Sequence, residues 1–202
     1  KKDITDQAEL HDVALISANG ETDIAKLIVE AISASGVDGS VIVEQAKGFK
    51  SELNVVDGYN VNRGYLSPYF VSDKNKMTCE YNNPLILIAD REFSSIHQVM
   101  KPLEIALEKN KPILIIANEI EGDALQGIVL NRTKGSLRVC AIKSPGFNIA
   151  RHDMLIDMSA VLGGSVITSA FDMNDFSEKD FATCEKIIVG RSSTLFVSKE
   201  KK

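Results

Sequence analysis

The chain has few cysteines, and they lack the spacing that cysteine-based sites require. Its 202 residues include three cysteines, Cys79, Cys140 and Cys184, which are odd in number and far apart. There is no Cys-x-x-Cys pair and no histidine at metal-ligand spacing, so the sequence indicates no metal site. We therefore expect the three cysteines to be buried, reduced thiols and the protein to reside in a reducing compartment.

Long apolar runs and an excess of positive charge are also missing. No stretch of about eighteen apolar residues is present that would span a membrane. The opening residues, KKDITDQAEL, lack the apolar core of a signal peptide. The formal net charge is -5, whereas a protein that reads duplex nucleic acid needs a basic face to neutralise phosphates. We therefore expect neither a membrane nor a nucleic acid among the partners.

The common motifs of nucleotide-binding and hydrolytic enzymes are absent as well. The sequence contains no GxGxxG, no GxxxxGK[ST] and no GxSxG. Asp90, at the end of a strand-like run, is a candidate catalytic residue because parallel sheets place sites there, although such an aspartate more often caps the next segment. No catalytic residue is specified. A small-molecule enzyme on a doubly wound α/β sheet is kept as the alternative function.

Near-continuous aliphatic strands that alternate with helices dominate the middle of the chain. Strand-like runs cover residues 85–90, 113–117, 137–142 and 165–168, and helical runs lie near residues 95–110, 121–135 and 150–162. This order predicts an α/β fold with a buried, largely parallel sheet covered on both faces. The module runs from about Gly58 to Thr168, and we expect the flanking segments at both ends to form a second small unit. Residues 21–35 predict a helix that Gly36 ends, and residues 40–44 and 52–56 are strand-like.

The helix predicted at residues 121–135, EGDALQGIVLNRTKG, has more large aliphatic side chains than one buried stripe needs. Gly135 is its expected left-handed stop. If Ala124 and Ile128 face a core, Leu125 and Leu130 are turned away from it. Outward aliphatic side chains of this kind are a candidate partner-binding surface. A helix sandwiched between two layers is the alternative.

Two further segments offer apolar surface. The helical run 95–110 has a wide apolar stripe interrupted by Pro102, and an interior proline costs about 3 kcal/mol unless the helix bends or starts nearby. The segment RGYLSPYF (63–70) places Tyr65, Tyr69 and Phe70 around a Ser-Pro turn. For both segments, packing against the core is the alternative.

Taken together, these segments resemble a group I chaperonin of the GroEL class. The resemblance is carried by ISAN (16–19), DGSVIVE (38–44), ELNVVDGYNVNRGYLSPYF (52–70), KPILIIA (111–117), EGDALQGIVLN (121–131) and KSPGF (143–147). It implies a GroEL-type apical domain, a layered sheet with helices on its faces, with small flanking intermediate-domain segments. Residues 1–57 correspond to the intermediate-domain segment, residues 58–197 to the apical polypeptide-binding domain and residues 198–202 to a tail.

The resemblance implies that the chain is a molecular chaperone fragment. In this family an apolar apical groove binds non-native polypeptides and the mobile loop of a co-chaperonin lid. Matched residue by residue, the groove positions are Tyr65, Tyr69, Phe70, Met100, Leu103, Leu125, Val129, Leu130 and Asn131, and Gly58 matches the hinge. Pro102 stands one position later than the proline of the family, and Asn118 replaces an acid that is common there.

The resemblance also implies what this fragment does not do by itself. The family's nucleotide-binding motif and catalytic aspartate belong to parts that have no match here, so we expect no catalytic residue, no metal and no cofactor in the fragment. The full-length parent is expected to be an ATP-hydrolysing, homo-oligomeric double ring that holds ATP and magnesium in its equatorial domain. It would work in a bacterial cytoplasm, a mitochondrion or a plastid. A purely structural scaffold segment is a third possible function.

Overall fold

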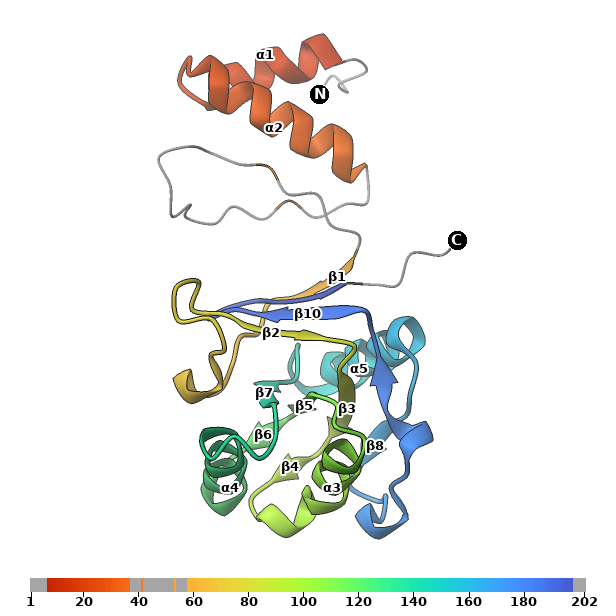
Figure 1. The fold of residues 1–202 in the computed structure, drawn as a ribbon. Helices are drawn as coiled ribbons and strands as arrows, with labels where there is room; N and C mark the ends of the chain where they lie inside the picture. Colours follow the sequence, from red (N-terminus) through yellow and green to blue (C-terminus); the bar gives the residue numbers. More distant parts are fainter. Residues whose placement is uncertain (1–6, 37–40, 42–52, 54–57, 198–202) are drawn as a thin grey trace. The chain divides into compact units, whose positions relative to one another are not determined.

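The chain forms two compact units in a computed structural model that describes residues 7–36, 41, 53 and 58–197 (Figure 1). The units are Lys1–Val56 and Asp57–Lys202. The assignment of the two units to intermediate and apical domains stays a prediction.

The described part of the first unit is a helical hairpin of α1 (Gln7–Ser17) and α2 (Thr22–Ser35). Small buried side chains, Ala14 on α1 with Ala25 and Ala31 on α2, let the two helices pack closely. Helix α2 ends as predicted at Gly36, whose φ of 72° suits a residue without Cβ. The sequence did not predict α1, because its apolar residues are spread around the helix. The strands expected at residues 40–44 and 52–56 lie almost wholly outside the described residues.

The core of the second unit is a parallel sheet. Its strands are β7 (Val139–Lys143), β5 (Ile113–Ala117), β3 (Leu85–Asp90) and β8 (Val166–Thr168), in that order. A short strand, β9 (Ala182–Thr183), pairs antiparallel with β3. All five residues of β5 are buried, as its unbroken aliphatic sequence predicts. Beyond the ends of β3 and β5 in the chain, β4 (Glu92–Phe93) and β6 (Glu119–Ile120) pair as a separate two-stranded parallel sheet. The predicted α/β fold with a buried parallel sheet is confirmed.

A second, antiparallel sheet was not predicted. It consists of β1 (Gly58–Val61), β11 (Thr194–Val197), β10 (Lys186–Val189) and β2 (Cys79–Asn82), in that order. In Figure 1 the labelled strands β1, β10 and β2 lie above the parallel strands.

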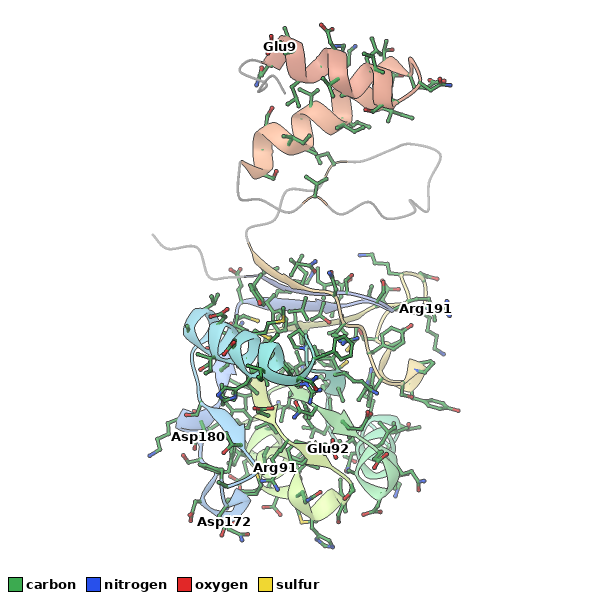
Figure 2. The ribbon with its side chains drawn as sticks, turned by 180° about the vertical axis from the view of Figure 1, so that it is seen from behind. Glu9, Arg91, Glu92, Asp172, Asp180 and Arg191 are labelled. Atoms are coloured by element: carbon green, nitrogen blue, oxygen red, sulfur yellow. The ribbon has the colours of Figure 1, made fainter. Side chains whose placement is uncertain are left out.

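The antiparallel sheet corrects our expectation for the C-terminal segment. We expected residues after Thr168 to leave the α/β module and to join the N-terminal segment. Instead, β10 and β11 turn Ile187, Val189 and Phe196 into the core of the second unit. Arg91, labelled in Figure 2, further fixes the segment by donating from Nη1 to the Phe171 carbonyl at 3.1 Å.

Three α-helices and four short 3-10 helices complete the part of the second unit that the structure describes, residues 58–197. They are η1 (Pro68–Phe70), η2 (Ile96–Gln98), α3 (Met100–Glu108), α4 (Gly122–Thr133), α5 (Asn148–Leu162), η3 (Met173–Asp175) and η4 (Glu178–Asp180). Helices α3 and α4 lie at the end of this unit away from β1 and β10 (Figure 1), and α5 lies in front of the parallel strands in Figure 2. None of the helices that the structure describes is both long and apolar enough to cross a bilayer.

The helix predicted at residues 95–110 is divided at Val99. The segment starts with η2, and α3 begins only at Met100. Pro102 is therefore the third residue of α3, where a backbone N–H has no partner within the helix and its loss costs little. We expected the helix either to bend at Pro102 or to start near it, and the helix starts near it.

Candidate polypeptide-binding groove

Helices α3 and α4 are held together through η2. Gly127 of α4 lies against Ile96 of η2 so closely that an added Cβ would stand 2.7 Å from the Ile96 Cδ1 atom. At the start of α4, Asp123 accepts a hydrogen bond at Oδ2 from the Ile96 backbone N–H at 3.2 Å. The absent side chain at Gly127 and this hydrogen bond fix the spacing between the two helices.

The space between these helices is an apolar groove. It encloses about 200 Å³ and is lined by Ile96, Met100, Leu103, Glu104, Leu107, Asn131, Ser136 and Leu137. Three of the predicted site residues, Met100, Leu103 and Asn131, therefore lie around one hollow. A larger hollow of about 550 Å³, bordered by Ser177, Glu178 and Lys179, is open to solvent and contains none of the predicted residues.

The predicted groove residues on α3 and α4 differ in exposure. Met100 is 38% exposed and Leu130 is 53% exposed, while Leu103 is only 8% exposed although it lines the hollow. Leu125, which we expected to be turned away from the core, is instead half-buried and packs against it, as does Val129. Ile128 is fully buried, as the sequence predicted. Helix α4 thus buries one side and still presents aliphatic surface.

Asn131 has a local hydrogen-bond role at the C-terminal part of α4. Its side-chain Nδ2 donates to the Gly127 carbonyl of the same helix at 2.9 Å. This contact satisfies one amide donor and keeps the half-buried side chain beside the groove. Leu107 also lines the groove and is 55% exposed. Leu107 belongs to the apolar stripe predicted at residues 95–110, but we did not include it among the groove positions, although it lies one turn after Leu103 on the same helix.

The aromatic segment packs against β7 and α4. Leu66 donates its backbone N–H to the Ala141 carbonyl at 2.9 Å, and Tyr65 forms an isolated bridge with Ile142, so both residues are attached to β7. The η1 turn that follows contacts α4. This turn separates two neighbouring aromatic residues, because Tyr69 is 70% exposed and Phe70 is fully buried. Of these two, only Tyr69 has surface to offer to a partner.

A polar network that the sequence did not predict lies where the parallel strands end. Asp90 Oδ2 lies 2.7 Å from Nδ1 of His152 on α5, and Asp90 Oδ1 accepts from Asn118 Nδ2 at 2.9 Å. Asn118 Oδ1 in turn accepts from the buried Ser144 hydroxyl at 2.9 Å. Position was a usable signal for three of these residues, because Asp90 ends β3, Asn118 follows β5 and Ser144 follows β7, whereas His152 lies within α5.

This network does not form the arrangement that a serine hydrolase needs. The Ser144 hydroxyl donates to Asn118, and His152 pairs with Asp90, so no serine–histidine contact is formed. Arg63 joins the network by donating from Nε to the Ser144 carbonyl at 3.2 Å. The groups mainly satisfy one another, and the network ties β3, β5, β7 and α5 together.

The Asp90 contacts lead to a prediction for stability against pH. Burial alone would raise the pKa of the Asp90 carboxyl, but hydrogen bonds from Asn118 and His152 and the charges of His152 and Arg151 lower it overall. A carboxyl with a lowered folded-state pKa stabilises the fold above its unfolded pKa of about 3.9, and this contribution is lost as the pH falls through the folded value. We expect Asp90→Asn to lower the free energy of unfolding by about 1–3 kcal/mol at pH 7.

Urea unfolding of wild type and Asp90→Asn at a series of pH values measures this effect. The difference between the two proteins should shrink as the pH is lowered below about 4, because the wild-type carboxyl then takes up a proton. A difference that stays constant down to the acid transition would show that the Asp90 charge does not stabilise the fold.

Comparison with known proteins identifies relatives along nearly the whole chain. It is 39% identical over 197 residues to the mitochondrial chaperonin CPN60 of Arabidopsis thaliana, with 96% of this chain and 34% of that protein covered. It is 38% identical over 196 residues to the mitochondrial chaperonin CPN60-1 of Zea mays, with 96% and 34% covered. It is also 38% identical over 194 residues to the mitochondrial chaperonin CPN60-like 1 of Arabidopsis thaliana, with 95% and 33% covered.

No family model matches the chain. The chain spans about a third of the length of the curated relatives it matches. The match covers 96% of the chain and confirms the resemblance drawn from the sequence. Over 96% of its length, this chain is a homologue of the GroEL-class CPN60 chaperonins.

Proposed function

We propose that the groove between α3 and α4 binds non-native polypeptides and, in competition with them, the mobile loop of a co-chaperonin lid. The observations that support this proposal are an apolar hollow lined by Met100, Leu103 and Leu107 of α3 and bordered by Asn131 of α4, and the exposed Leu130 next to Asn131 on α4, in a homologue of CPN60 chaperonins. Apolar surface grouped in this way marks interaction sites on soluble proteins.

The energetics of the groove suit weak and unselective capture. Burial of a large aliphatic side chain from full exposure contributes about 1.5–3 kcal/mol, and the partly exposed Met100, Leu107 and Leu130 each have a fraction of that to give. Association costs are subtracted from the sum. What remains is modest affinity for many apolar segments without a requirement for one sequence.

The burial of the predicted residues divides their proposed roles. Tyr69, Met100 and Leu130 are the proposed contact residues, with Tyr65, Leu125 and Val129 contributing their partly exposed surfaces. Leu103 lines the hollow as a nearly buried side chain, Asn131 borders it, and Phe70 packs in the core of the unit.

Gly58 remains the proposed hinge. It is the first residue of β1, immediately after the boundary between the two units, and it pairs with Val197. In this conformation a Cβ on Gly58 would stand 2.4 Å from the Phe196 carbonyl oxygen. Glycine is therefore required here by close approach of the backbone, in addition to any rotation that a hinge would need.

For the full-length protein we propose an ATP-hydrolysing, homo-oligomeric double ring that assists folding. ATP and magnesium would be held by the family's equatorial domain, which has no counterpart among the residues of this chain. The three relatives named above are mitochondrial proteins, which favours the mitochondrion over a bacterial cytoplasm or a plastid.

The double variant Leu125→Ser/Val129→Ser tests the proposed binding surface. Both side chains lie on α4 and are half-buried, so we expect the variant to bind a denatured protein and a lid-loop peptide about tenfold more weakly. Fluorescence anisotropy of a labelled peptide and retention of a denatured client measure the loss. Circular dichroism and thermal unfolding show whether the variant is folded.

Ile156→Ser/Val161→Ser on α5 is a control for the loss of exposed aliphatic surface outside α3 and α4. We expect it to bind as the wild type does. Wild-type binding by a well-folded Leu125→Ser/Val129→Ser variant would refute the proposal. Failure of the unaltered chain to bind either ligand would favour the structural scaffold instead.

A further inference from the structure

The turn between α1 and α2 contains the single Asn-Gly step of the sequence, Asn19–Gly20. Both residues are exposed, and both have a positive φ, 53° at Asn19 and 86° at Gly20. Glycine has no Cβ, so its backbone nitrogen is less shielded than that of any other residue that carries an N–H. The side-chain amide of Asn19 is therefore followed by an unhindered nucleophile.

Asn19 also forms the C-terminal cap of α1. Its backbone N–H donates to the Ile16 carbonyl at 3.1 Å, and the Gly20 N–H donates to the Leu15 carbonyl at 2.9 Å. These two bonds, with a left-handed residue directly after the helix end, make a Schellman motif. The nitrogen that could attack the Asn19 amide is thus occupied as a donor while the cap is closed.

The cap lies at a place where a helix opens locally. Helix α1 has 11 residues and buries one of them, Ala14, so little apolar contact holds its last turn. The turn that follows is exposed. Helix ends with few buried contacts open at a small fraction of the free energy of global unfolding. Opening of the cap frees the Gly20 nitrogen from Leu15.

We propose that Asn19 is a site of spontaneous deamidation, controlled by the opening of this cap. The Gly20 nitrogen attacks the side-chain carbonyl carbon of Asn19, a C–N bond forms, the bond to the amide nitrogen breaks, and ammonia leaves with the proton from Gly20. Water then opens the resulting succinimide ring at either carbonyl carbon. The products are aspartate and isoaspartate, and no electrons are transferred.

Helix α3 ends in the same motif and provides an internal control. Asn110 has a φ of 51°, is exposed, and donates its backbone N–H to the Leu107 carbonyl at 3.0 Å. The next N–H, of Lys111, donates to the Ala106 carbonyl at 3.0 Å. The side chain of Lys111 hinders its backbone nitrogen, whereas Gly20 has no side chain. Asn110 should therefore keep its amide.

Both products of the reaction would weaken the cap. In isoaspartate the main chain runs through the former side chain, which inserts an extra carbon before Gly20, so the two cap bonds can no longer form together. Aspartate keeps the main chain but places a negative charge at the negative end of the α1 dipole. The Gly20 amide hydrogen should therefore exchange with solvent faster after conversion.

Peptide mapping by mass spectrometry of the folded chain, aged at mildly alkaline pH, tests the proposal. Digestion at acidic pH prevents conversion during the mapping. We expect loss of the unmodified Asn19 peptide and gain of two peptides with a carboxyl in place of the amide. An isoaspartate methyltransferase should methylate one of them. The Asn110 peptide should stay unchanged over the same time.

Two variants separate the effect of the following residue from that of the cap. Lys111→Gly should make Asn110 lose its amide as well. Asn19→Gly keeps a residue that suits the left-handed cap position, so it should release no ammonia here and keep slow exchange at Gly20. The comparison of Asn19 with Asn110 within the wild-type chain decides the proposal even if a variant does not fold.

Three results would overturn the proposal. The first is an Asn19 amide that persists in the folded chain while it is lost from the chain unfolded in urea. The second is equal conversion of Asn19 and Asn110, which would remove the role of Gly20. The third is unchanged hydrogen exchange at Gly20 after conversion, which would show that the cap does not control the site.

Discussion

Replacing Phe70 by alanine is expected to lower the free energy of unfolding by about 3–5 kcal/mol. The ring is fully buried, and η1 places it beneath a turn that contacts both α4 and β7. Its removal takes apolar surface out of the core and leaves a cavity that the short turn cannot fill by collapse. Urea unfolding monitored by circular dichroism measures the loss.

The neighbouring residue Tyr69 supplies the control. Its side chain is 70% exposed, so Tyr69→Ala should change the free energy of unfolding by no more than about 0.5 kcal/mol. The same variant should weaken binding of a denatured client, because it removes proposed contact surface. A neutral Phe70→Ala variant, or a Tyr69→Ala variant that is destabilised to the same extent, would contradict the placement of the two rings.

The parallel sheet could be predicted because each of its strands is recognisable from its own residues, without knowledge of the strand it pairs with. The sequences LILIAD and ILIIA are apolar on both faces, and only a strand covered on both sides buries all of them. Gly36 and Gly135 ended their helices as predicted, because each has a positive φ that a residue without Cβ adopts at little cost. These features depend on a few neighbouring residues.

The antiparallel sheet could not be predicted, because its pairing is between distant parts of the chain. Strand β1 pairs with β11, so the identity of a four-residue segment near residue 60 depends on residues beyond 190. Short alternating strands have little signal of their own. The same reason explains the polar network, in which Asp90 meets His152 only after α5 has folded over the strands.

The proposed groove residues come from the resemblance, and the sequence predicted outward positions for Leu125 and Leu130 only, of which Leu130 is exposed and Leu125 is half-buried. Tyr69 and Phe70 are adjacent aromatic residues, and nothing in the sequence distinguishes which of the two rings is exposed. The η1 turn, with Ser67 accepting from the Tyr69 backbone N–H at 3.4 Å, directs one ring outwards and the other inwards. Leu103 and Met100 are divided in the same way by the start of α3 after Val99. The position of a residue in the family motif predicts that it belongs to the groove. Its burial determines how much surface it has to offer to a ligand.

The largest loss of client binding is expected from the double variant Met100→Gln/Leu130→Gln. Met100 on α3 and Leu130 on α4 are both substantially exposed, so they give apolar surface to a ligand while the fold depends little on them. Glutamine is similar in length and suits a helix. Loss of both contacts should weaken binding by about 2–3 kcal/mol, or about 30- to 150-fold in Kd. Anisotropy titration of a labelled lid-loop peptide measures the change.

Helix α5 provides a control of almost the same composition. Met154 and Val161 are 40% and 60% exposed, so Met154→Gln/Val161→Gln removes a methionine and an aliphatic residue of comparable exposure from outside the groove. Both double variants should unfold at nearly the wild-type temperature, and only the groove variant should lose the peptide. Equal losses in the two variants would mean that clients adhere to exposed apolar surface in general. In that case the spacing of α3 and α4 set by Gly127 and Ile96 would have no part in recognition.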